Sequence, residues 1–222
     1  MVGEVNFRLA LPLDHIVQCA ALFDFGRQNV VEEDLAQAVV ALFDQLAAQE
    51  MDYLLVGGLA LLRYISGRNT EDVDLIIAAS DLERLEGLVV ESREPHFVRG
   101  RFHGLGVDGL LTTNRLFAHV KRYCADRLTF RGRTIPCVTV EGLILLKLYA
   151  LPSLYRQAQF NKVALYETDV TMLLQAHSVE MEPIFKTLQA HLSTADIEAL
   201  REIHREIAEK FETRRRRFTD RS

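Results

Sequence analysis

Two stretches decide the fold of this chain: Leu54-Leu55-Val56-Gly57-Gly58 and, fourteen residues after Gly58, Asp72-Val73-Asp74-Leu75. The apolar residues at 53–56 and 73–78 predict two short strands. The nearly continuous apolar character of the second strand indicates that both of its faces are covered. Because side chains two residues apart in a strand point to the same face, Asp72 and Asp74 are expected to project together from a strand that is held rigidly in the core.

The two motifs have complementary chemistry. Asp72 and Asp74 carry like charges that repel unless a cation lies between them, and their oxygen ligands suit Mg²⁺ or Mn²⁺. Gly57 and Gly58 permit positive φ and allow backbone N–H groups to approach a phosphate at the start of a helix expected over 59–65. Either motif alone is common in turns and solvated loops, but the two together, between apolar strands, indicate a metal and phosphate site.

Outside this region the pattern predicts a mixed α/β (α+β) protein with a small sheet flanked by helices. We expect a core over 1–138 with an N-terminal helical extension near 15–25, and a helical C-terminal portion over 139–222 packed on it. A polar stretch is expected after the helix at 81–91, and Pro152 is expected to end the helix that begins at 139. The other expected elements are helices from 34 onward, 162–177 and 196–211, and strands at 105–111, 128–130 and 135–138.

Composition excludes several classes of protein. The 222 residues are 49% hydrophobic and 26% charged, which excludes disordered, collagenous and coiled-coil chains. Cys19, Cys124 and Cys137 are odd in number and form no CxxC pair, so we expect a reducing, cytoplasmic location. No apolar window approaches the ~20 residues of a membrane span, and the first residues do not resemble a signal peptide. The sequence also lacks the motifs GxxxxGK[ST], GxGxxG, HExxH and GxSxG.

Charge is unevenly distributed along the chain. The net charge is −5, yet residues 93–133 contain nine basic and three acidic side chains. Such a stretch favours a polyanionic partner, a phosphate or a nucleic acid, with a solvated surface as the alternative. His103, in the same stretch, is expected to be a loop residue rather than a nucleotide contact.

Val56-Gly57-Gly58 followed by Arg68-Asn69-Thr70-Glu71-Asp72-Val73-Asp74-Leu75 resembles the signature of the DNA polymerase β-like nucleotidyltransferase superfamily. Within it, the run is most similar to the minimal AbiEii/MenA-type nucleotidyltransferases, which include toxins of bacterial toxin–antitoxin systems. The resemblance extends over residues 35–174. It implies a nucleotidyltransferase core and a metal-dependent transfer of a nucleoside monophosphate from an NTP, such as ATP, to an acceptor hydroxyl.

The resemblance also implies roles for individual residues. Asp72 and Asp74 correspond to metal ligands, and Asp108 is the best match to a third carboxylate that binds metal on a neighbouring strand. The alternative for Asp108 is a turn between two glycines. The nucleotide contacts implied by position are those of Gly57, Gly58, Arg68 and Thr70 with the triphosphate.

Lys147 and Asp169 stand out because each lies on an apolar stretch of a predicted helix. A cation in such a place must extend to solvent or find an anion, so a structural salt bridge between the two explains both. The resemblance implies instead that Lys147 binds the nucleotide phosphates and that Asp169 acts as a base or orients the reactants.

The distribution of charge indicates candidates for the acceptor. The basic stretch makes RNA, such as a tRNA 3′ end, the leading candidate, because neutralisation of phosphates by Lys and Arg dominates such binding. Two alternatives remain: a non-catalytic antitoxin or nucleotide-binding regulator, and transfer to a protein or to a small molecule such as an antibiotic. A toxin would also bind a protein antitoxin.

Overall fold

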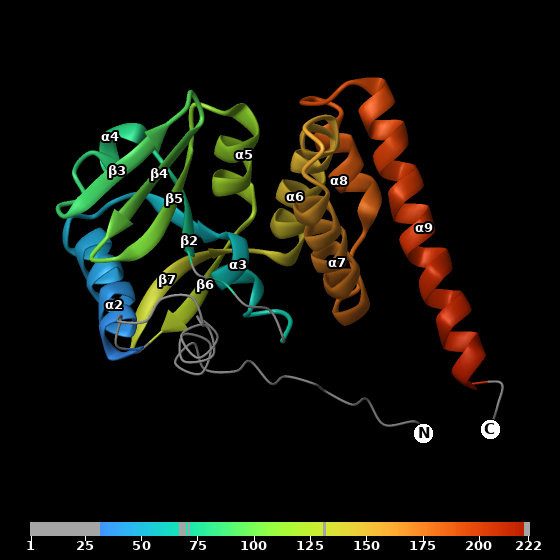
Figure 1. Ribbon diagram of the computed structural model, residues 1–222, viewed down its shortest axis with the longest axis horizontal. Coiled ribbons are helices and arrows are strands. Elements are labelled where there is room, and N and C mark those ends of the chain that lie inside the picture. Colours follow the sequence, from blue (N-terminus) through green and yellow to red (C-terminus); the bar gives the residue numbers. More distant parts are fainter. Residues whose placement is uncertain (1–31, 67–69, 71, 131, 220–222) are drawn as a thin grey trace. The chain divides into compact units, whose positions relative to one another are not determined.

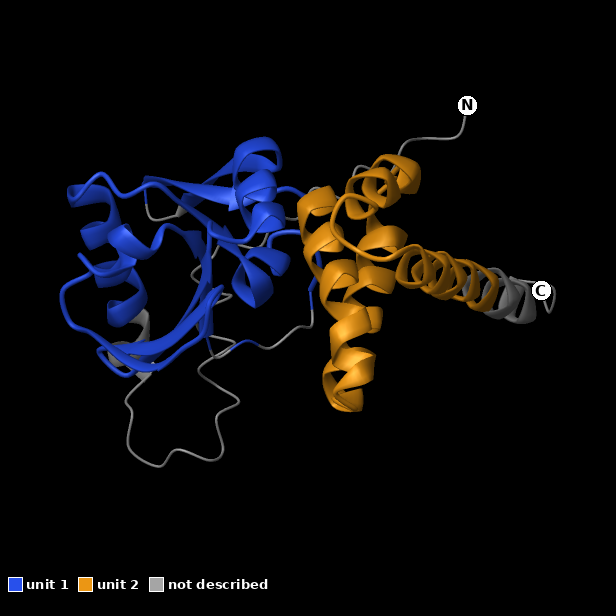
Figure 2. Cartoon of the chain, turned by 90° about the horizontal axis from the view of Figure 1, so that it is seen from above, with its two compact units in different colours: residues 1–139 blue, residues 140–222 orange. Residues whose placement is uncertain are grey.

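The computed structural model describes residues 32–66, 70, 72–130 and 132–219 of the chain (Figure 1). The helix expected near 15–25 and the triphosphate contact expected at Arg68 lie outside these residues. The chain divides into two compact units, Met1–Thr139 and Val140–Ser222 (Figure 2). In the described part, no helix has the length and apolar character needed to span a membrane.

One seven-stranded mixed sheet, in the order β3-β4-β5-β2-β1-β7-β6, organises the first unit. β1 is parallel to β7 and β2 is parallel to β5, while the other neighbours are antiparallel. The predicted mixed α/β class is therefore confirmed. The strands are β1 (Tyr53–Val56), β2 (Asp72–Ile77), β3 (Leu88–Arg93), β4 (Phe97–Phe102), β5 (Leu105–Leu111), β6 (Ala125–Phe130) and β7 (Arg133–Val138).

One face of this sheet is covered by α2 (Glu32–Ala48) and α4 (Ala79–Leu82). The Phe43 ring of α2 lies 6.1 Å from the Tyr53 ring of β1, and Leu82 of α4 lies over Gly109 of β5. Val73, Leu75 and Ile77 point to this same face and are fully or almost fully buried. This anchors β2 in the core, as the apolar pattern predicts.

Among the described elements, α5 (Arg115–Tyr123) covers part of the opposite face. Asn114 caps this helix, because its side-chain oxygen accepts hydrogen bonds from the N–H groups of Leu116 and Phe117 at 2.9 and 3.3 Å. The Phe117 ring packs edge-on against Phe97 of β4, with centroids 5.3 Å apart. Asp72, the first residue of β2, also points to this face. The short helix α3 (Gly57–Leu61) follows β1 directly.

The region 81–104 differs from the prediction. Instead of a helix over 81–91 and a polar stretch, α4 ends at Leu82, and β3 and β4 form an antiparallel pair. β4 alternates regularly, with Val98, Gly100 and Phe102 buried. The signal is weak because a glycine stands at a buried position, where an added Cβ would lie 2.7 Å from the Val89 carbonyl oxygen. Two helices, α5 and α8 (Met181–Leu188), were also not predicted.

The second unit is helical, as expected, and consists of α6 (Val140–Arg156), α7 (Phe160–Ala176), α8 (Met181–Leu188) and α9 (Thr194–Thr219). The prediction that Pro152 ends the first helix is wrong, because α6 continues through it to Arg156. A proline inside a helix removes one hydrogen bond. Here Leu148, Leu151 and Pro152 are all buried, and this packing compensates for the lost bond.

Candidate functional site

Three carboxylates share one face of the sheet in the first unit. Asp74 of β2 lies opposite Val56 of β1 and opposite Asp108 of β5. Directly paired residues point to the same face, and Asp72 precedes Asp74 by two positions, so Asp72, Asp74 and Asp108 form what we call the acidic face. Asp72 is exposed and the other two are half-buried. Asp108 therefore lies within a strand, and the alternative that places it in a turn is wrong.

Two glycines provide the space that the carboxylates of Asp72 and Asp74 occupy. A Cβ atom added at Gly106 would lie 1.8 Å from Asp72 Oδ1, and one added at Gly57 would lie 1.8 Å from Asp74 Oδ2. Gly57 also has a φ of 65°, which disfavours any side chain. Asp72 thus leans over β5 and Asp74 over the turn that follows β1, a separation that lowers the repulsion between like charges.

The first residues of α3 and the residue Thr70 are tied to β2 by polar contacts. The Gly58 N–H donates to Asp74 Oδ2 at 3.3 Å, and Thr70 Oγ1 donates to the Asp72 carbonyl oxygen at 3.2 Å. Thr70 also packs against Gly58, where an added Cβ would lie 2.4 Å from its Oγ1. Gly57, Gly58 and Thr70 therefore lie beside the two acids, and Gly58 and Thr70 already bond to β2.

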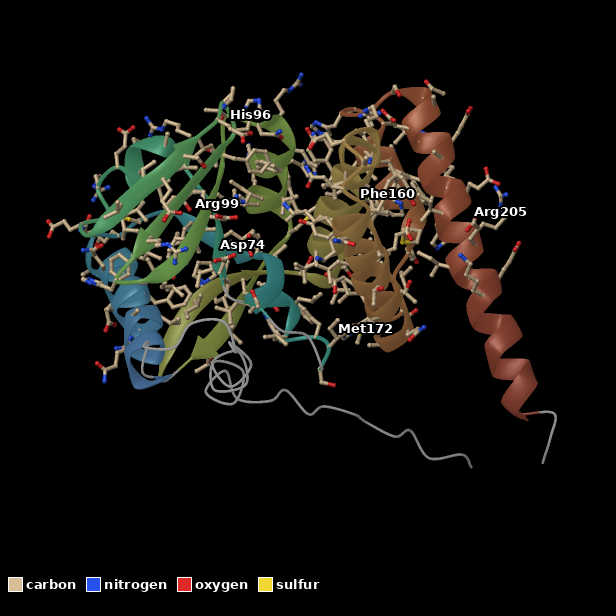
Figure 3. The ribbon with its side chains drawn as sticks, in the orientation of Figure 1. Asp74, His96, Arg99, Phe160, Met172 and Arg205 are labelled. Atoms are coloured by element: carbon tan, nitrogen blue, oxygen red, sulfur yellow. The ribbon has the colours of Figure 1, made fainter. Side chains whose placement is uncertain are left out.

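Arg99 of β4 brings a positive charge to the acidic face (Figure 3). Its Nε and Nη2 each donate to one oxygen of Asp108, both at 3.0 Å. Hydrogen bonding to Asp108 and the charge of Asp108, followed by the charges of Asp72 and Asp74, raise the pKa of the Arg99 guanidinium. Arg99 thus interacts electrostatically with all three carboxylates.

Sequence reasoning placed Arg99 only among nine basic residues and gave it no role at the site. The signal was present in the alternation of Phe97-Val98-Arg99-Gly100-Arg101-Phe102, which places Arg99 on the solvent side of a strand. The pairing of Arg99 with Asp108 depends on the register between β4 and β5, which local pattern alone does not give.

The acidic face has the donor chemistry that Mg²⁺ or Mn²⁺ requires. Mg²⁺ usually takes one or two protein carboxylates and completes its shell with water and substrate phosphates, so Asp72 and Asp74 are the candidate protein ligands. Both Asp108 oxygens bond to Arg99. Across the described residues, no three or more His, Cys, Asp or Glu side chains are grouped to hold a metal ion. Arg99 and a cation would therefore compete for the charge of Asp108.

Lys147 and Asp169 form a buried ion pair within the second unit. Lys147 Nζ lies 2.7 Å from Asp169 Oδ2, and the two side chains are 8% and 0% exposed. The same Nζ lies 4.4 Å from the centre of the Tyr166 ring, a cation–π contact. The structural salt bridge considered from the sequence is therefore present, whereas the roles in phosphate binding and proton transfer remain predictions.

The basic stretch at 93–133 is largely neutralised by ion pairs. At least five of its nine basic side chains contact carboxylates, and four of these carboxylates come from outside the stretch. The pairs are Arg93–Glu83, Arg99–Asp108, Arg101–Glu91, Lys121–Asp52 and Arg133–Asp44. The excess of positive charge in the sequence is therefore smaller on the folded surface.

No protein-family model and no curated protein matches this chain. Among solved structures, it is similar to the antibiotic-resistance factor ANT(2'')-Ia in solution, with a TM-score of 0.49 and 14% identity over 83% of this chain and 99% of that one. The crystal structure of ANT(2'')-Ia in complex with adenylyl-2''-tobramycin gives a TM-score of 0.47 and 14% identity over 76% and 99%. An antigenic nucleotidyltransferase-like protein from Paracoccidioides brasiliensis gives 0.48 and 17% over 76% and 92%.

The glycine at 106 provides a test of the acidic face. In Gly106→Ala, the new methyl group displaces the end of the flexible Asp72 side chain, so we expect little change in melting temperature. Mn²⁺ binding, measured by the electron paramagnetic resonance signal of free Mn²⁺, should weaken about tenfold or more. The matched control is Gly109→Ala in the same strand, which faces Leu82 on the opposite side. Equal Mn²⁺ affinity in the two variants contradicts this role of Gly106.

The ion pair of the second unit provides a test of stability. Asp169→Asn leaves the Lys147 charge buried without its counter-charge, and we expect the free energy of unfolding in urea to fall by about 3 kcal/mol. The double variant Lys147→Met with Asp169→Leu should recover most of this loss. Glu206→Gln, which breaks the exposed pair between Lys210 and Glu206, serves as the control and should change little. Unchanged stability in Asp169→Asn contradicts a structural role.

Proposed function

We propose that this chain is a metal-dependent nucleotidyltransferase that transfers a nucleoside monophosphate from an NTP to an acceptor hydroxyl. The observation that carries the proposal is the acidic face, where Asp72, Asp74 and Asp108 lie on two adjacent parallel strands beside a glycine turn. Three like charges on one face disfavour one another, and a divalent cation bound among them would relieve this repulsion.

In the proposed reaction, the acceptor hydroxyl oxygen forms a bond to the α-phosphorus of the NTP. The bond from this phosphorus to the bridging oxygen breaks, pyrophosphate leaves, and the hydroxyl proton passes to a base. Asp72 and Asp74 would hold Mg²⁺, which would supply electrostatic stabilisation of the charge that develops in the reaction. The backbone N–H of Gly58 fixes the Asp74 carboxylate, and Thr70 fixes the end of β2 from which Asp72 projects.

Further residues enter the proposal by resemblance. Asp108 is a candidate third carboxylate, and Gly57, Gly58, Arg68 and Thr70 are candidate triphosphate contacts. Lys147 and Asp169 are candidates for phosphate binding and proton transfer. Their mutual ion pair already accounts for the burial of both charges, so their catalytic roles rest on the resemblance alone.

The acceptor is proposed in two forms. An RNA end, such as the 3′ end of a tRNA, is the first, and it is supported by the basic stretch at 93–133; a toxin acting on tRNA would have a protein antitoxin as its partner. A cationic small molecule with a free hydroxyl, such as an antibiotic, is the second. It is supported by the ion pairing of that stretch and by the net charge of −5.

The test uses each NTP labelled at the α-phosphate, incubated with the full chain, Mg²⁺ and either total RNA, a cationic aminoglycoside or cellular protein. We expect label on one acceptor, and a loss of about a hundredfold or more in the rates of Asp72→Asn and Asp74→Asn. Asp126→Asn, which removes an exposed carboxylate of β6 paired with Arg63, should retain the rate. Binding of NTP without transfer to any acceptor supports the non-catalytic alternative instead.

A further inference from the structure

Arg99 lies opposite Asp108 because of the turn that joins β4 and β5. His103 and Gly104 form this turn with φ values of 49° and 85°, and both positive values are typical of a two-residue type I′ hairpin. The turn fixes the pairing of Phe102 with Leu105, and three residues farther along each strand it pairs Arg99 with Asp108. The register therefore fixes the backbone of Arg99 opposite Asp108.

The contact between Arg99 and Asp108 has two hydrogen bonds but little burial. The side chains are 60% and 23% exposed. Exposed ion pairs contribute little to stability, so this contact can break readily. The same guanidinium geometry that fits a carboxylate also fits a phosphate with two hydrogen bonds.

Arg101, two residues along the same strand and on the same face, provides a comparison. Its Nε donates to Glu91 of β3 at 2.8 Å, and its Nη1 to the Gly104 carbonyl oxygen at 3.3 Å. Arg101 thus binds a carboxylate of the edge strand β3, whereas Arg99 binds a carboxylate of β5 that belongs to the acidic face.

We propose that Arg99 is an exchangeable counter-ion of the acidic face: it neutralises Asp108 before substrate arrives, and its guanidinium moves to the polyphosphate when a metal–NTP complex binds. This inference rests on the proposed function. Arg99 and the divalent cation then compete for the negative charge of the acidic face, while Arg99 and the metal cooperate in binding the triphosphate. These two relations have opposite signs, which a purely structural ion pair does not produce.

The first arm of the test measures Mn²⁺ alone. The paramagnetic signal of free Mn²⁺ is followed during titration of the full chain, its Arg99→Gln variant and the control Arg101→Gln. Asp74→Asn measures the Mn²⁺ that binds at sites other than the acidic face. Loss of a positive charge near the acidic face should tighten Mn²⁺ binding about fivefold in Arg99→Gln. Arg101→Gln should match the wild-type chain.

The second arm measures a non-hydrolysable NTP analogue in the presence of saturating Mn²⁺, by isothermal titration calorimetry. Affinity for the analogue should fall about tenfold in Arg99→Gln, because a charged contact with phosphate is lost. Arg99→Lys keeps the charge but cannot form two parallel hydrogen bonds, so its affinity for the analogue should lie between those of the wild-type chain and Arg99→Gln.

Two failures are distinguishable. If the wild-type chain binds Mn²⁺ and the analogue but Arg99→Gln equals Arg101→Gln in both arms, the exchange role of Arg99 is wrong and the proposed function stands. If the wild-type chain binds neither Mn²⁺ nor the analogue, the proposed function is wrong, and the role of Arg99 is wrong with it.

Discussion

Repulsion among three carboxylates on one sheet face is the constraint on which the site depends. Strands β2 and β5 hold the backbone of Asp72, Asp74 and Asp108 in fixed register, so the charges cannot separate by moving the chain. The structure reduces the repulsion locally, through glycines that let the first two carboxylates lean apart and through Arg99 on the third. A divalent cation with a polyphosphate would satisfy the same charges more completely, and this is the basis of the proposed function.

The sequence predicts those features of the site that depend on short local patterns. Period-2 alternation placed Asp72 and Asp74 on one face of a buried strand, and two glycines after an apolar strand predicted the turn at Gly57. Both are local patterns, and both match the structure. Asp108 was placed on its strand by alternation as well, although only the parallel pairing brings it opposite Asp74.

Features that depend on distant pairing were missed or misjudged. The contact of Arg99 with Asp108 needs the hairpin register, and the ion pairs of the basic stretch need partners such as Asp44 and Asp52, far away in the sequence. The strand β4 was missed because Gly100 occupies a buried position, where close packing on β3 replaces a side chain. Pro152 was misjudged because tertiary packing outweighs its local effect on the helix.

The binding of a divalent cation at the acidic face is tested most directly by anomalous X-ray scattering from crystals of the full chain grown with Mn²⁺ and a non-hydrolysable NTP analogue. We predict an anomalous peak within bonding distance of the Asp72 and Asp74 carboxylates and in contact with the phosphates of the analogue. Well-ordered analogue bound elsewhere, or an acidic face whose carboxylates contact only protein groups and carry no peak, would contradict it.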